Sequence, residues 1–188
     1  MNNPHRLAAL LAAPALLALA SCQSAPPMPT VASVDLPRFM GAWYIIANIP
    51  TIIERDAHNA VEAYQLDPDG SIDTHFTFRV RGFDGKRKAY NPRGFVLDRQ
   101  SNALWGMRFV WPLKSDYRII YLSDDYSQTV IGRQKRDYVW IMARTPEIPA
   151  ADYERLLRFV AAQGYDRSKV QRVPQQWPQQ AVGSATAP

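Results

Sequence analysis

Histidine and cysteine, two residue types that often perform catalysis or bind metals, are scarce among the 188 residues and form no catalytic pattern. The three histidines, His5, His58 and His75, are scattered along the chain, and Cys22 is the only cysteine. Neither a metal site nor an intrachain disulfide is therefore predicted. The sequence has no G-x-S-x-G motif, no P-loop and no G-x-G-x-x-G motif. It thus indicates no catalytic residue and no cofactor, and it favours a binding protein over an enzyme.

The first 21 residues have the pattern of an export leader. Arg6 precedes an apolar run from Leu7 to Ala20, which is too short and too rich in alanine to predict a membrane-spanning helix. We interpret residues 1–21 as a lipoprotein signal peptide. The alternative is an ordinary secretory leader that is cut near residues 20–21 and leaves an unmodified thiol.

Cys22 is the residue for which the sequence predicts a covalent modification. The tetrapeptide at 19–22, Leu-Ala-Ser-Cys, resembles the lipobox of bacterial lipoproteins, in which the cysteine is acylated and becomes the new N-terminus. Gln23 follows it, and by the same resemblance this favours the outer membrane over the inner one. The resemblance implies a lipid-anchored protein that faces the periplasm.

The composition fits a single globular domain between two irregular ends. Apolar residues make up 47% of the chain and aromatic residues 11%, with a formal charge of +5. No basic stripe interleaved with aromatic residues suggests a nucleic-acid partner. Residues 22–33 contain three prolines and are predicted to be a flexible tether behind the anchor. Residues 174–188 are predicted to be a disordered tail, which leaves 34–173 as the domain.

Short runs of β-branched and aromatic residues alternate with turn residues over most of that domain. Tight turns are indicated by Asp-Pro-Asp-Gly at 67–70 and by Gly-Phe-Asp-Gly at 82–85. Strands are predicted at 41–50, 59–66, 71–81, 87–97, 103–110, 116–122, 126–133 and 137–144. The pattern predicts an all-β fold, an eight-stranded antiparallel up-and-down barrel whose closure removes exposed sheet edges.

One helix is predicted after the strands. Tyr153, Leu156, Leu157 and Val160 recur at helical spacing and form an apolar stripe that should pack on the outside of the barrel. Gly164 is the expected stop signal. A short strand is expected near 170–173.

Three separate segments carry a family resemblance. The first contains Gly41 and Trp43 in a G-x-W pattern, the second is the turn at 121–126, and the third ends a strand with Arg144. Their order and spacing resemble the three signature regions of the lipocalins. Their amino-acid sequences are similar to those of the bacterial lipocalins and of apolipoprotein D. The resemblance covers about 34–173 and implies a barrel with a cavity for one small ligand.

The three segments should meet at one end of the barrel, because consecutive antiparallel strands alternate in direction. Trp43 is expected to fill this base, with the Arg144 guanidinium lying on its indole ring. Gly41 would leave room for the close approach. We predict that Gly41, Trp43 and Arg144 are structural.

The opposite end should be the open mouth of a ligand cavity. Alternation places Ile72, Thr74, Phe76, Phe78 and Val80 on one inward face. By resemblance to apolipoprotein D, the ligand contacts would also include Phe39, Tyr64, Phe109 and Trp140. If Tyr64 points inward then so does Glu62, unless a register break turns it outward. A barrel filled by its own side chains is the alternative to a cavity.

The loops at the mouth carry an excess of basic residues, whereas those at the base are acidic. The basic residues are Lys86, Arg87, Lys88, Arg133, Lys135 and Arg136. We predict that they attract an anionic head group or an anionic membrane face, with a larger effect on capture rate than on affinity; the alternative is that they are only solvated loop residues.

Together these features predict a membrane-anchored carrier of amphiphilic lipids such as fatty acids or lysophospholipids, serving membrane maintenance or stress. The alternatives are an envelope-structural lipoprotein without a ligand and an enzyme of the same fold acting on a lipid or isoprenoid. A homodimer is left open.

Overall fold

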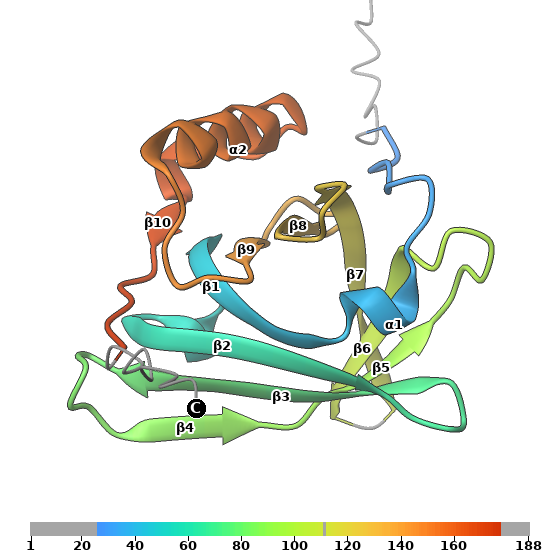
Figure 1. Ribbon diagram of the computed structural model, residues 1–188, viewed down its shortest axis with the longest axis horizontal. Coiled ribbons are helices and arrows are strands. Elements are labelled where there is room, and N and C mark those ends of the chain that lie inside the picture. The colour runs from blue at the N-terminus through green and yellow to red at the C-terminus, as the bar shows by residue number, and fades with distance from the viewer. Residues whose placement is uncertain (1–25, 111, 178–188) are drawn as a thin grey trace, which may run out of the picture.

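A closed antiparallel barrel forms the centre of the protein. The computed structural model describes residues 26–110 and 112–177. The strands are β1 (Gly41–Ile49), β2 (Ala57–Leu66), β3 (Ser71–Val80), β4 (Arg87–Tyr90), β5 (Arg93–Val96), β6 (Leu104–Val110), β7 (Leu113–Leu122), β8 (Gln128–Gly132), β9 (Val139–Ala143) and β10 (Gln171–Arg172). Neighbours pair in the order β1-β2-β3-β5-β6-β7-β8-β9, and β1 also pairs with β9, which closes the sheet (Figure 1). Strand β4 pairs with β3, and β10 pairs with β1. Because β4 and β5 share one position beside β3, the barrel has the eight strands that the sequence predicts.

The strand predicted at 87–97 is interrupted, and this corrects the sequence-based assignment. Strand β4 pairs with the part of β3 nearer the mouth, and β5 pairs with the part nearer the base. Asn91 and Pro92 lie between them. Proline has no N–H to donate to a strand ladder, so the strand breaks at this point.

Alternation along β2 and β3 decides which side chains point into the barrel. On β3, Ile72, Thr74, Phe76 and Phe78 are buried, as predicted. On β2, Ala60, Glu62 and Tyr64 are buried. The register of β2 shifts between His58 and Val61, where Asn59 has a φ of 49°. This bulge lies on the mouth side of Glu62, so it does not turn Glu62 outward.

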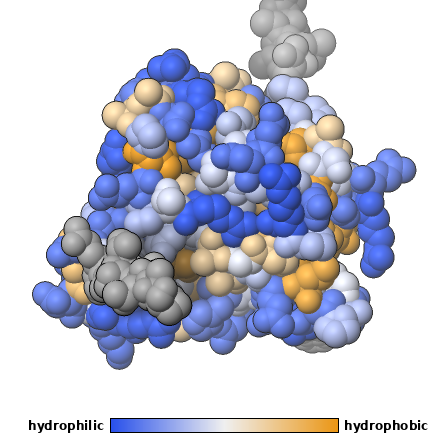
Figure 2. All heavy atoms as spheres, viewed as in Figure 1, coloured by the Kyte–Doolittle hydropathy of each residue, from blue (hydrophilic) through white to orange (hydrophobic). Residues whose placement is uncertain are grey.

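Helix α2 (Ala150–Ala162) covers the outside of the barrel (Figure 1). Its predicted apolar stripe is buried against a second hydrophobic cluster that includes Ile46, Ile120 and Val139. The outer surface of the helix is mainly hydrophilic (Figure 2). Gly164 follows the helix with a φ of 88°, a conformation that favours glycine. Two more short helices, α1 (Leu36–Phe39) and the 3-10 turn η1 (Ile52–Glu54), flank β1, and a further 3-10 turn, η2 (Arg167–Lys169), precedes β10.

The segment before the barrel is held against it, so the prediction of a flexible tether is wrong for residues 28–33. Met28 is buried, and its N–H donates to the Gln134 side chain at 2.8 Å. The Val31 N–H donates to the Ile119 carbonyl at 2.9 Å. These contacts follow the barrel wall beside β7 (Figure 1). Cys22 and the predicted signal peptide lie outside the described residues.

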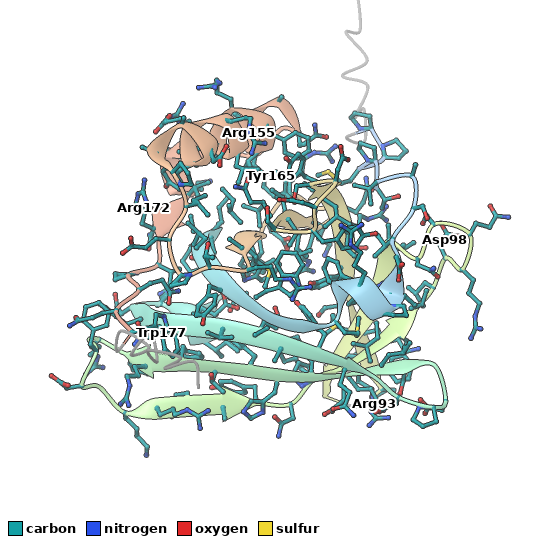
Figure 3. The ribbon with its side chains drawn as sticks, viewed as in Figure 1. Arg93, Asp98, Arg155, Tyr165, Arg172 and Trp177 are labelled. Atoms are coloured by element: carbon teal, nitrogen blue, oxygen red, sulfur yellow. The ribbon has the colours of Figure 1, made fainter. Side chains whose placement is uncertain are left out.

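The segment after β10 is also ordered as far as residue 177, contrary to the prediction of a disordered tail from 174. The Gln175 amide donates to the carbonyls of Ile45 at 2.8 Å and Ala60 at 3.2 Å. The Trp177 ring, labelled in Figure 3, packs edge-on against Tyr44, with 5.4 Å between the ring centres. Residues 178–188 of the predicted tail lie outside the described residues.

Candidate ligand-binding cavity

The base of the barrel is closed by Trp43 and Arg144. Trp43 is fully buried, and the Arg144 guanidinium lies 3.8 Å from the centre of its ring system. The same guanidinium donates to the carbonyls of Ala42, Arg38 and Phe39 at 2.9–3.0 Å. The cation–π contact expected from the sequence is present, and the three hydrogen bonds fix the guanidinium in place.

Gly41 allows this close approach. Its φ is 92°, and a side-chain carbon added there would lie 3.4 Å from the Arg144 guanidinium. The left-handed backbone conformation restricts the residue type at this position more than the space beside Arg144 does, since residues with a Cβ rarely adopt it.

Above Trp43, aromatic rings form a plug. Phe39 lies 5.0 Å from Trp43, 5.8 Å from Tyr64 and 5.5 Å from Trp105, measured between ring centres. The Tyr64 and Tyr117 hydroxyls are hydrogen-bonded at 2.5 Å. Phe39 and Tyr64 were predicted as ligand contacts from the family resemblance, but the structure places both in this plug, outside the cavity lining.

A cavity of about 550 Å³ lies above the plug. Its deeper wall is formed by Ile45, Glu62, Phe76, Met107 and Tyr117. Its rim includes Ile52, Ile53, Phe109, Tyr138 and Trp140. Four predicted ligand contacts, Glu62, Phe76, Phe109 and Trp140, therefore lie on its wall. Phe78 does not line the cavity; it packs behind Phe76 and stacks on Tyr90 at 6.1 Å.

Glu62 is a buried carboxyl on the cavity wall, with a relative exposure of 8%. Burial raises the pKa of Glu62 to about 7 from its ordinary value of 4.5. The Tyr64 hydroxyl opposes this rise, and the negative charge of Glu54 adds to it. The carboxyl is thus held near the midpoint of its titration at neutral pH.

Glu54 is a second buried carboxyl, which sequence reasoning missed. It accepts hydrogen bonds from Asn48 at 2.8 Å, Trp140 at 2.9 Å and Thr51 at 3.0 Å. Burial raises the pKa of Glu54, and these three donors oppose the rise. The Thr-x-x-Glu pattern at 51–54 is a helix-capping signal that could have located it. Glu54 fastens the β1–β2 loop to β1 and β9 at the cavity rim.

The basic residues predicted at the mouth differ in their placement. Arg133 lines the cavity, 3.5 Å from the Asp137 carboxylate. Arg136 is committed elsewhere, because it donates to the carbonyls of Gln163 at 2.7 Å and Pro26 at 3.0 Å. The four others, Lys86, Arg87, Lys88 and Lys135, are exposed and do not line the cavity. Within the described ranges, no cluster of side chains is suited to hold a metal ion.

A family model described as a lipocalin-like domain matches residues 34–175. The chain belongs to the lipocalin family. This lipocalin is 29% identical to temperature-induced lipocalin-1 of Arabidopsis thaliana over 157 residues, which cover 79% of this chain and 83% of that protein. It is 28% identical to the outer membrane lipoprotein Blc of Escherichia coli K12 over 178 residues, which cover 87% of this chain and 94% of that protein.

Solved structures share the fold at lower sequence identity. Insecticyanin from the tobacco hornworm Manduca sexta superposes with a TM-score of 0.62 and 15% identity, covering 82% of this lipocalin and 86% of that chain. Apocrustacyanin C2 gives a TM-score of 0.60 and 11% identity, covering 76% and 80%. In the part of this lipocalin that the structure describes, no helix is long and apolar enough to cross a membrane.

Proposed function

We propose that this lipocalin binds and carries single-chain amphiphilic lipids, such as fatty acids or lysophospholipids, in the cell envelope. The observation that carries the proposal is the cavity of about 550 Å³ above a closed base, with aliphatic and aromatic side chains on most of its wall. Its volume lies within the range of small-molecule sites. Homology to proteins named outer membrane lipoprotein Blc supports the envelope as the place of action.

The free energy available from an acyl chain supports useful affinity. Burying about 15 methylene groups at ~0.8 kcal/mol each gives on the order of 12 kcal/mol before costs. Losses of translational freedom and chain entropy remove about half of this or more. Affinity near the micromolar range is therefore expected.

Ser115→Trp should block lipid binding. Ser115 lies on the cavity wall near the mouth, so an indole there would occupy the space of the acyl chain. We expect a loss of affinity of about tenfold or more for a lysophospholipid, measured by native mass spectrometry.

Lys114→Trp is the matched control on the same strand. The Lys114 ammonium lies over the Phe95 ring at 4.2 Å, and Lys114 does not line the cavity. This variant should bind as the wild type does. Equal binding by both variants would show that the lipid lies elsewhere. If the protein carries no lipid when it is purified from its own membrane, the alternative of an envelope-structural lipoprotein is favoured. If it converts a bound lipid into a product, the alternative of an enzyme is favoured.

We further propose that Cys22 is acylated and anchors the lipocalin to the outer membrane, facing the periplasm. Relatives named as outer membrane lipoproteins support this proposal. Cys22→Ser should move the protein from the membrane fraction to the soluble fraction or leave it unprocessed, as read by fractionation and by the mass of the N-terminal peptide. Unchanged fractionation would contradict the anchor.

A further inference from the structure

The deep wall of the cavity carries polar groups that a lipid inserted with its hydrocarbon chain first would leave without a partner. These groups are the Glu62 carboxyl and the Tyr117 hydroxyl. The rim carries the charged residues Asp116 and Arg133, but it also presents Ile52, Ile53 and Phe109, which have relative exposures of 76%, 41% and 50%. A ligand that satisfies the deep groups has its polar end deep and its hydrocarbon against these apolar rim residues.

The Glu62 carboxyl is available to such a ligand. It is more than nine-tenths buried and lies on the cavity wall. Among the described residues, its hydrogen-bonding neighbour is the Tyr64 hydroxyl, which lowers the pKa of Glu62. The same hydroxyl is also hydrogen-bonded to Tyr117 at 2.5 Å. A carboxylate has two oxygens that accept hydrogen bonds, so a second donor supplied by a ligand would be favoured at this buried site.

The charges around Glu62 favour a cation in particular. Glu54 on η1 adds a second carboxyl to the same cavity. At the rim, Asp116 on β7 is paired with Arg118 at 3.0 Å, and Arg133 after β8 faces Asp137.

The remaining deep wall is uncharged. Its aromatic rings from β3 and β7, Phe76 and Tyr117, can also face a cation. Strands β1 and β6 contribute the aliphatic side chains of Ile45 and Met107. No basic side chain among the described residues lines this deep part of the cavity.

We propose that the cavity takes an amphiphilic amine head first, with its ammonium group on the Glu62 carboxylate and its hydrocarbon chain running to the apolar rim. This inference rests on the proposed lipid-binding function and names the class of lipid that the site prefers. Most of the basic mouth residues lie outside the cavity lining. This placement is consistent with the proposal, because a ligand whose ammonium group lies deep in the cavity needs no basic residue at the mouth.

The test compares dodecylamine, dodecanol and dodecanoate, which share a chain and differ in the head group. Each is titrated at about neutral pH into the Cys22→Ser chain, which keeps every described residue, with calorimetry and native mass spectrometry as readouts. We expect the amine to bind about 10- to 100-fold more tightly than the carboxylate, the range of a charge-assisted hydrogen bond. Amine binding should also release a proton from Glu62, which calorimetry in buffers of different ionisation enthalpy detects.

Two variants assign the preference to one side chain. Glu62→Gln should abolish most of the preference and the proton release. Asp73→Asn removes a carboxylate from the exposed outer face of β3 and should leave both unchanged. The proposal is overturned if dodecanoate binds as tightly as dodecylamine, or if Glu62→Gln keeps the preference. Equal binding of all three chains would leave the lipid-binding function standing, whereas binding of none would reject both.

Discussion

Trp43→Ala is expected to lower the free energy of unfolding by about 3–5 kcal/mol, the range for truncating a buried aromatic side chain. Trp43 is fully buried at the base, and its indole N–H donates to the Phe39 carbonyl at 2.9 Å. Its removal opens a void beneath the aromatic plug and takes the ring away from the Arg144 guanidinium. Because the Trp43 ring and the Arg144 guanidinium contact each other, the loss in free energy of unfolding should differ from the sum of the energies of their separate contacts.

Urea unfolding followed by circular dichroism measures this loss, with Trp177→Ala as the matched control. Trp177 packs on the outside of the barrel and is 39% exposed. Its truncation should cost about 1 kcal/mol or less. A similar cost for the two variants would show that the base is not a stability centre.

Glu62→Gln is expected to flatten the pH dependence of stability by up to about 3 kcal/mol, because one pKa unit corresponds to about 1.4 kcal/mol. The folded pKa of Glu62 is about 7, against an ordinary value of 4.5. Between these values the folded state binds more protons than the unfolded state, so stability falls as the pH rises. The contribution is fully present below pH 4.5 and is lost by the time the pH passes about 7.

The wild type and Glu62→Gln should therefore differ little at about pH 5, and the variant should be the more stable at about pH 8. Glu54 also has a raised pKa, so some slope should remain in the variant. The measurement is the urea midpoint at both pH values. Asp73→Asn should show no such change, and an equal difference between wild type and Glu62→Gln at both pH values would exclude Glu62 as the source.

The strands could be predicted because their signals are local. Alternation on β3 and the turn residues at 67–70 act within a few positions of one another, and the structure follows both. The base was predictable through the family resemblance of Gly41, Trp43 and Arg144. Alternation gives the face of a side chain but not its depth. The family resemblance likewise assigned Phe39 and Tyr64 to the cavity, although they lie in the plug beneath it.

The packing of residues 28–33 and 174–177 against the barrel could not be predicted from composition. Residues 28–33 and 174–177 are rich in residues typical of linkers, yet Met28 and Gln175 find partners that are more than 100 positions away in sequence. Such contacts exist only once the barrel has formed. Glu54 was missed for a related reason, since its donors come from β1, from Thr51 just before η1, and from Trp140 on the distant strand β9.

The attachment of Pro26 beside the mouth has a consequence for membrane contact if Cys22 is acylated. The Pro26 carbonyl accepts from Arg136 at 3.0 Å, in the loop between β8 and β9 at the mouth. Only three residues lie between it and Cys22, so the four residue steps span at most about 14 Å at ~3.6 Å per residue. If Cys22 carries acyl chains, this short linker holds the mouth close to the bilayer. The encounter between the two is then intramolecular, with an effective concentration on the order of millimolar. Lipid transfer from vesicles should then be nearly independent of protein dilution for the anchored form and proportional to concentration for Cys22→Ser.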